Sequence, residues 1–120
     1  DTHGLPSGGK VPVDFVTGVP GGMPGTPPAL LAGVAMLPPQ VTSWSATGIG
    51  RTHLPIAAAA LSAGGHLRVG MEDNVVFARG VPVEHNRQLV ERVAQLAEVM
   101  QRPAMSTDDA RALLGVKDRR

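Results

Sequence analysis

The segment His66-Leu-Arg-Val-Gly-Met-Glu-Asp-Asn74 carries residue types that an active site needs: a guanidinium, two carboxylates and an amide. In an extended strand the side chains alternate, so Arg68 and Glu72 lie on one face while Val69 and Met71 lie on the other. Charged groups are tolerated inside a protein where they are paired, bound to a metal or solvated at an opening. The pattern therefore favours a binding site at the end of this strand.

The same residues also have a simpler interpretation. Arg68 and Glu72 can form an ion pair that is only structural, which contributes little when it is exposed. Asp73 and Asn74 can merely shape a turn, because both residue types favour turns through hydrogen bonds to their own backbone. The residues alone leave the two interpretations open.

Two glycine-rich loops, at 18–25 and 47–51, follow strand-like runs. The first lacks the Gly-Lys-Ser/Thr of a P-loop and the spacing of a dinucleotide fingerprint, and a sharp turn that needs glycine also explains it. Exposed backbone N–H groups at Gly21 and Gly22, ahead of a helix, could still hold a carboxylate or part of a cofactor phosphate. Arg51 is the candidate anion contact in the second loop.

Histidine, serine and cysteine give little further chemistry. The four histidines, His3, His53, His66 and His85, show no metal-ligand spacing, so each is expected to be structural or exposed. No serine has the Gly-x-Ser-x-Gly context of a nucleophile elbow, so a serine hydrolase finds no support. The chain has no cysteine, so a metal would have to use histidine and carboxylate ligands, and the composition fits a reducing cytoplasm.

Hydrophobic periodicity predicts strands and helices that alternate through short glycine-rich links. The expected strands are 11–17, 41–46 and 66–71. The expected helices are 29–37, 54–63, one that Asn86 caps and that extends to Met100, and one that Ser106 caps and Gly115 ends. This order indicates an α/β fold with parallel strands, either a barrel segment or a doubly wound sheet. In both, the loops after the strands meet at one edge, so the glycine loops and Glu72-Asp73 should lie together.

Composition limits the classes of protein that fit. The chain has 120 residues, whereas a complete eightfold barrel needs on the order of 250. Hydrophobic residues make up 42% of it and charged residues 18%, which is enough apolar side chain for a core. A net charge of +1 without a basic stripe argues against nucleic acid as a partner. No apolar run approaches the roughly 20 residues of a membrane span, so we expect a soluble protein.

Several motifs together resemble the β-keto acid cleavage enzymes. The most specific is Gly64-Gly-His-Leu-Arg-Val-Gly-Met-Glu-Asp-Asn74, followed by Asn86-x-x-Leu-Val-Glu-Arg92 and Ala110-Arg-x-Leu-Leu-Gly115. Upstream, Phe15-Val-Thr-Gly-Val-Pro-Gly-Gly22 and the stretch from Trp44 to Gly48-Ile-Gly-Arg51 are also similar to that family. The resemblance covers nearly the whole chain. It implies the last three β/α units of a TIM (β/α)₈ barrel.

The resemblance also implies a reaction and roles for residues. The family uses zinc and condenses a β-keto acid with acetyl-CoA, giving acetoacetate and a new CoA ester. Its metal is held by a His-x-His pair and by the Glu of an Arg-Val-Gly-x-Glu-Asp motif, which here is Glu72. Asp73 would be the base that helps break the carbon–carbon bond, and Arg68 would orient it and stabilise developing negative charge. Barrels of this family commonly assemble as homo-oligomers.

The chain departs from the family because it contains no His-x-His pair. It opens at Asp1, without Met, in a loop-like stretch, and its basic end at 117–120 is expected to fray. We therefore expect the N-terminal half of the barrel to come from upstream in a longer polypeptide or from a partner chain. Two alternatives remain: a non-catalytic fragment or half-barrel scaffold, and a different metal-dependent barrel enzyme such as an aldolase or hydrolase.

Overall fold

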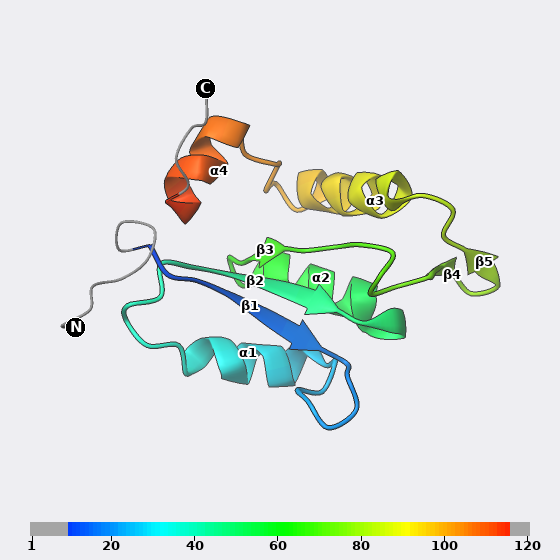
Figure 1. Ribbon diagram of the computed structural model, residues 1–120, viewed down its shortest axis with the longest axis horizontal. Coiled ribbons are helices and arrows are strands. Elements are labelled where there is room, and N and C mark those ends of the chain that lie inside the picture. Colours follow the sequence, from blue (N-terminus) through cyan, green and yellow to red (C-terminus); the bar gives the residue numbers. More distant parts are fainter. Residues whose placement is uncertain (1–9, 116–120) are drawn as a thin grey trace.

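A computed structural model describes residues 10–115 and shows an α/β fold built on a parallel sheet (Figure 1). The sheet has the order β1-β2-β3, made of β1 (Pro12–Thr17), β2 (Ser43–Gly48) and β3 (His66–Leu67). Helix α1 (Pro27–Ala35) connects β1 to β2, and η2 (Gly50–Thr52) with α2 (His53–Ser62) connects β2 to β3. The predicted alternation of parallel strands and helices is therefore confirmed.

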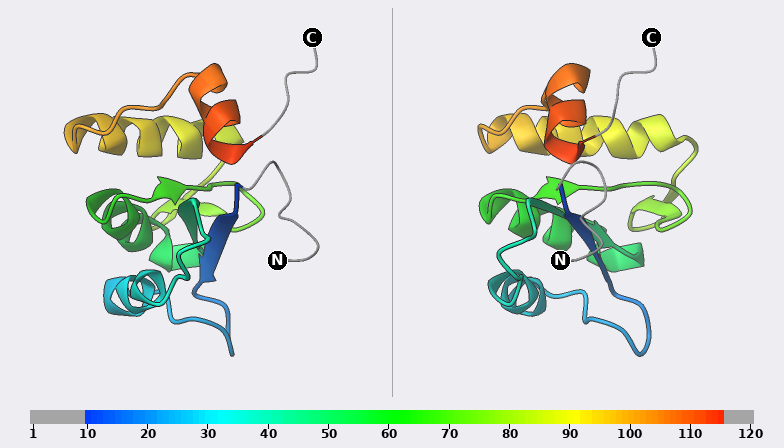
Figure 2. Two further views of the ribbon diagram at one scale, coloured as in Figure 1. Left: turned by 90° about the vertical axis from the view of Figure 1, so that its left-hand side faces the viewer. Right: turned by 60° about the vertical axis from the view of Figure 1, so that its left-hand side comes forward.

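The core lies between the sheet and the helices α1 and α2, which cover one of its faces (Figure 2). Its buried residues are Leu30, Ala46, Ile56 and Ala60, with Phe15, Val34, Trp44, Ala59 and Leu67 packed against them. The rings of Phe15 and Trp44 meet edge to face with 6.0 Å between their centroids. Because strand side chains alternate, burial of this apolar face directs the intervening residues of β1 and β2 to the opposite face.

Capping residues set the ends of two helices, and the sequence predicted those of the second, Ser106 and Gly115. Thr26 Oγ1 accepts a hydrogen bond from the N–H of Ala29 at 3.4 Å and so caps α1. Ser106 Oγ accepts from the N–H of Asp109 at 3.1 Å and caps α4 (Thr107–Leu114). Gly115 ends α4 with a φ of 71°, a left-handed conformation that favours glycine.

The third strand is shorter than the sequence predicts. The expected strand 66–71 ends at Leu67, although the N–H of Arg68 still donates to the carbonyl of Ala46 at 3.1 Å. The chain then turns, because the N–H groups of Asp73 and Asn74 both donate to the carbonyl of Gly70, at 3.1 and 3.2 Å. The prediction of an extended strand up to Met71 is wrong for this reason.

A hairpin and two helices follow this turn. Strands β4 (Val76–Ala78) and β5 (Val81–Pro82) form an antiparallel pair that the sequence analysis did not predict. Helices α3 (Asn86–Val99) and α4 then lie on the β3 side of the sheet (Figure 2).

The predicted cap of α3 is wrong. The capping position is His85 rather than Asn86. The side-chain oxygen of Gln88 reaches back and accepts from the N–H groups of Glu84 and His85, at 2.6 and 3.1 Å, as in one half of a capping box.

Some expectations cannot be compared with the structure or are met only in part. Those on Asp1, His3 and 117–120 lie outside the described residues. The apolar stripe of α3 is only partly covered, since Leu89 is fully buried while Val90 is 52% exposed. No helix between residues 10 and 115 is long and apolar enough to cross a membrane.

Candidate functional site

The predicted site residues after β3 come together in one cluster. Arg68 lies 3.3 Å from Glu72, between Nη2 and Oε1, and 3.5 Å from Asp73, between Nη1 and Oδ2. The side chains of Arg68 and Glu72 are 50% and 57% exposed, whereas that of Asp73 is only 15% exposed. One guanidinium therefore lies between an exposed carboxylate and a nearly buried one.

The contact between these charges comes from the turn and not from strand alternation. We call residues 70–73 the acidic turn. The Glu72 carboxylate folds back over Gly70, where an added Cβ would lie 2.4 Å from either of its oxygens. Any side chain at Gly70 would therefore displace Glu72 from Arg68. Oδ2 of Asp73 is buried and accepts no hydrogen bond from the described residues, and its charge is paired with the Arg68 guanidinium at 3.5 Å.

The loop after β2 touches the acidic turn, as predicted. The N–H of Gly50 donates to the carbonyl oxygen of Asp73 at 2.8 Å, and the N–H of Ile49 donates to the carbonyl of Thr17 at 3.0 Å. The carboxyl ends of β1, β2 and β3 thus meet at one edge, where parallel α/β proteins bind ligands. Arg51, the candidate anion contact, is exposed and directly follows Gly50.

The loop after β1 is built for close packing more than for display of its N–H groups. Added Cβ atoms at Gly18 and Gly25 would lie 2.8 and 2.2 Å from side-chain atoms of Thr52, so both positions need glycine. The N–H of Gly22 already donates to the carbonyl of Val19 at 2.9 Å. Only Gly21, with nothing near its Cβ position, faces open space, so the predicted anion-binding role of this loop remains a prediction.

A polar network on the sheet face opposite α1 and α2 was missed by the sequence analysis. The carboxylate of Asp14 accepts hydrogen bonds from Ser45 Oγ at 2.7 Å and from Thr47 Oγ1 at 2.9 Å. Separately, the buried hydroxyl of Thr17 donates to the backbone carbonyl of Thr47 at 3.1 Å. Alternation along β1 would have placed Asp14 on this face, but its partners depend on a strand register that the sequence does not show.

A buried histidine lies at the start of α2, behind the site. His53 is 5% exposed and its Nε2 has no hydrogen-bond partner among residues 10–115. Burial lowers the pKa of His53 from its ordinary value of 6.5, and the nearby Arg92 guanidinium lowers it further. The Arg92 guanidinium packs against Phe77, 4.2 Å from the centroid of its ring, and donates a hydrogen bond to the carbonyl of Phe77.

We expect His53 to make stability depend on pH. Because its pKa is lowered in the folded state, the unfolded chain binds more protons, so the free energy of unfolding falls as the pH drops below about 6.5. This loss ends once the pH is below the folded-state pKa. Thermal denaturation at pH 7.5 and 5.5 should show the loss, and it should be smaller in His53→Gln. An equal loss in both proteins would contradict the prediction.

The described residues provide at most part of a metal site. No group of three histidine or carboxylate side chains is close enough to hold a metal within the described range 10–115. The carboxylate of Glu72 is exposed, and of its two oxygens Oε1 is engaged by Arg68. A catalytic zinc site needs three protein ligands and an open position, so two further ligands would have to come from elsewhere.

The fold and the cluster define an α/β protein with a charged site at the carboxyl edge of its parallel strands. Comparison with known proteins identifies the family: the family model of the beta-keto acid cleavage enzymes matches residues 2–116. The chain belongs to this family of enzymes, which confirms the resemblance.

The relatives that the chain resembles are named as a cleavage enzyme and as transferases that use acetyl-CoA. The chain is 42% identical over 103 residues to a 3-keto-5-aminohexanoate cleavage enzyme of Acetoanaerobium sticklandii, covering 86% of this chain and 37% of the relative. It is 39% identical over 111 residues to a 3-oxoadipate:acetyl-CoA acetyltransferase of Cupriavidus necator, covering 90% and 39%. It is 34% identical over 107 residues to a 3-dehydrocarnitine:acetyl-CoA trimethylamine transferase of Rhizobium meliloti, covering 89% and 35%. The chain thus spans little more than a third of these relatives.

Proposed function

We propose that this chain contributes the acidic turn to an enzyme that cleaves a β-keto acid with acetyl-CoA, giving acetoacetate and a new CoA ester. The observation that carries the proposal is the Arg68 guanidinium held between Glu72 and Asp73, at 3.3 and 3.5 Å. Membership of the family and the acetyl-CoA transferases among the relatives support it.

The two carboxylates have environments that suit different tasks. Asp73 is nearly buried and its Oδ2 accepts no hydrogen bond within the described part of the chain, so we assign it the role of proton acceptor. Arg68 orients that oxygen and leaves part of its guanidinium exposed for negative charge that develops on the substrate. Glu72, the exposed carboxylate, is the residue that we assign to the metal.

Zinc, when bound by Glu72 and two ligands from outside this chain, would supply Lewis-acid polarisation of the substrate ketone. We assign Gly21 and Arg51, in the loops after β1 and β2 at this edge of the sheet, to the binding of acetyl-CoA. Gly22 was predicted beside them, but its N–H is engaged within the loop.

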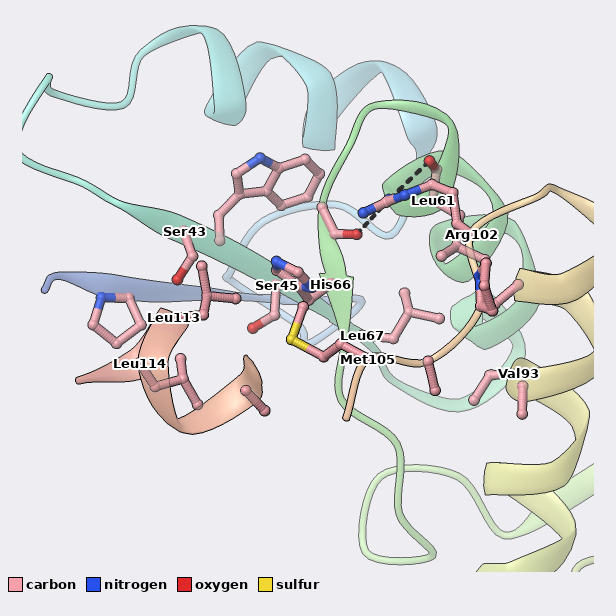
Figure 3. Close-up of a pocket in the computed structure, with 18 of the residues that line it drawn as sticks. Ser43, Ser45, Leu61, His66, Leu67, Val93, Arg102, Met105, Leu113 and Leu114 are labelled. Atoms are coloured by element: carbon pink, nitrogen blue, oxygen red, sulfur yellow. Dashed lines mark hydrogen bonds between the residues drawn. The ribbon is translucent and has the colours of Figure 1, made fainter. Parts of the chain in front are cut away.

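We further propose that the rest of a (β/α)₈ barrel packs beside β3. Within residues 10–115, β3 pairs only with β2, so its other edge is open. A cavity of about 500 Å³ lies between the first residues of the three strands and helices α3 and α4, at the opposite end of the strands from the acidic turn (Figure 3). Figure 3 shows Val93 of α3 and Leu113 and Leu114 of α4 facing it. Open strand edges and apolar linings normally acquire a partner, in this case the remaining barrel strands.

An isotope experiment on the full-length protein distinguishes this function from its rivals. In a balanced reaction, carbon 2 of the keto acid loses a proton to the base and joins the acetyl carbonyl carbon as the thioester C–S bond breaks. The CoA thiolate then takes the acyl group as the C2–C3 bond breaks, and carbon 2 regains a proton. Acetyl-CoA labelled on its acetyl group should therefore give labelled acetoacetate and an unlabelled CoA ester. Turnover without acetyl-CoA would indicate an aldolase or hydrolase instead, and no turnover with any β-keto acid would favour the scaffold alternative.

A further inference from the structure

The side chain of Asn86, the first residue of α3, reaches back to the acidic turn. Its Oδ1 accepts a hydrogen bond from the backbone N–H of Met71 at 2.7 Å, across fifteen positions of sequence. Met71 directly precedes Glu72. The bond therefore fixes the backbone at the point where the chain leaves β3 and turns toward Arg68.

Asn86 is free to make this contact because the capping position of its helix is the preceding residue, His85. Asparagine near a helix start normally accepts from the first N–H groups of that helix. Here Asn86 is already the first helical residue, and its side-chain oxygen accepts from the N–H of Met71 instead. The Asn86 side chain is therefore not needed for capping.

The acidic turn is held from two sides. Asn86 holds the N–H of Met71 before Glu72, and the N–H of Gly50 holds the carbonyl of Asp73 after it, at 2.8 Å. Neither contact involves a charged side chain of the cluster, so Glu72 and Asp73 keep their carboxylates for other partners. The backbone between the two contacts determines where those carboxylates lie.

We propose that Asn86 is a positioning residue for Glu72, a role that rests on the proposed function. The contact is exposed, so water can replace Asn86 at the N–H of Met71 and the fold loses little when the amide is removed. The turn, however, loses the fixed direction that places Glu72 beside Arg68. Groups that orient a metal ligand without binding the metal change affinity or activity by about 10–100-fold when they are removed.

The test uses three variants of the full-length protein. Asn86→Leu removes the acceptor at similar size, and Asn86→Asp keeps an acceptor at a helix start, where negative charge is favoured. Arg87→Ala is the matched control, because it alters the neighbouring residue and loses only an exposed ion pair with Glu91. The readouts are zinc affinity, kcat and KM, and the hydrogen-exchange rate of the Met71 amide.

Asn86→Leu should lower zinc affinity and kcat by about tenfold or more, with faster exchange at Met71 and a change in thermal midpoint of no more than about 4 °C. Asn86→Asp should recover most of the zinc affinity and of kcat, and Arg87→Ala should match the wild type. Unchanged zinc affinity in Asn86→Leu, or no rescue by Asp, would overturn the inference. A Met71 amide that is unprotected from exchange in the wild type would also overturn the inference, and this measurement needs no variant. A wild type without zinc and turnover would instead overturn the proposed function.

Discussion

Glu72→Gln in the full-length protein is expected to remove bound zinc and to lower kcat/KM by at least about 10²-fold. The reason is that a neutral amide is a poor zinc ligand, and polarisation of the ketone by zinc lowers the activation free energy by several kcal/mol. Each loss of about 1.4 kcal/mol slows the reaction tenfold. The fold should survive, because the Glu72 side chain is 57% exposed and its pair with Arg68 is a surface ion pair. Elemental analysis and initial-rate kinetics measure the two effects.

Glu91→Gln is the matched control for this experiment. Glu91 is also an exposed carboxylate, at 63%, and also pairs with an arginine four positions away in sequence, Arg87. It lies on α3 outside the acidic turn, so zinc content and turnover should not change. Retention of zinc and activity by Glu72→Gln would refute the assignment of Glu72, whatever the control shows.

Asp73→Asn is expected to lower kcat by about 10²–10⁴-fold while the zinc content stays at the wild-type level. An amide of the same size cannot accept the proton, yet it preserves the shape of the turn, including the bond from the Gly50 N–H to the backbone carbonyl of residue 73. Steady-state kinetics with zinc analysis of the same preparation provide the measurement.

The control for Asp73→Asn is Asp108→Asn, which removes an 86% exposed carboxylate paired with Arg111 on α4. Zinc loss in Asp73→Asn would show that Asp73 is a ligand and not the base. Near-normal kcat would show that the proton acceptor lies elsewhere. Glu72→Gln and Asp73→Asn therefore separate metal binding from proton transfer within one cluster.

Local sequence signals were sufficient to predict most of the helices and the first two strands. Thr26 and Ser106 act on backbone groups three residues away, so their effect can be read from the chain itself. Apolar periodicity likewise predicted which segments form the layer of α1 and α2 over the sheet. The family resemblance then added roles that periodicity alone could not give.

The acidic turn was predicted in its membership but not in its geometry. Strand alternation put Arg68 and Glu72 on one face, and the structure does bring them to 3.3 Å. The contact forms because the backbone turns at Gly70, whose carbonyl accepts two hydrogen bonds. Asn86 and Gly50, which are distant in sequence, also make hydrogen bonds to this turn. Asp73 reaches the cluster for the same reason.

Features that depend on long-range pairing could not be predicted. The partners of Asp14, Ser45 and Thr47, lie 31 and 33 positions away in sequence, so they are neighbours only once the strands have paired. The hairpin β4–β5 is too short to show strand periodicity. It also receives a hydrogen bond from Arg92 of α3, which is distant in sequence. The contact between Asn86 and Met71 was hidden because Asn86 was interpreted as a helix cap.

The zinc-to-protein ratio of the full-length protein, by elemental analysis beside its intact mass, tests the central claim most directly. The described residues offer one carboxylate ligand, so a ratio near one would mean that further ligands from outside this chain complete the site at Glu72. We expect that result. A ratio near zero in a preparation that still converts β-keto acid and acetyl-CoA would contradict the account, because the acidic turn would then act without the metal assigned to it.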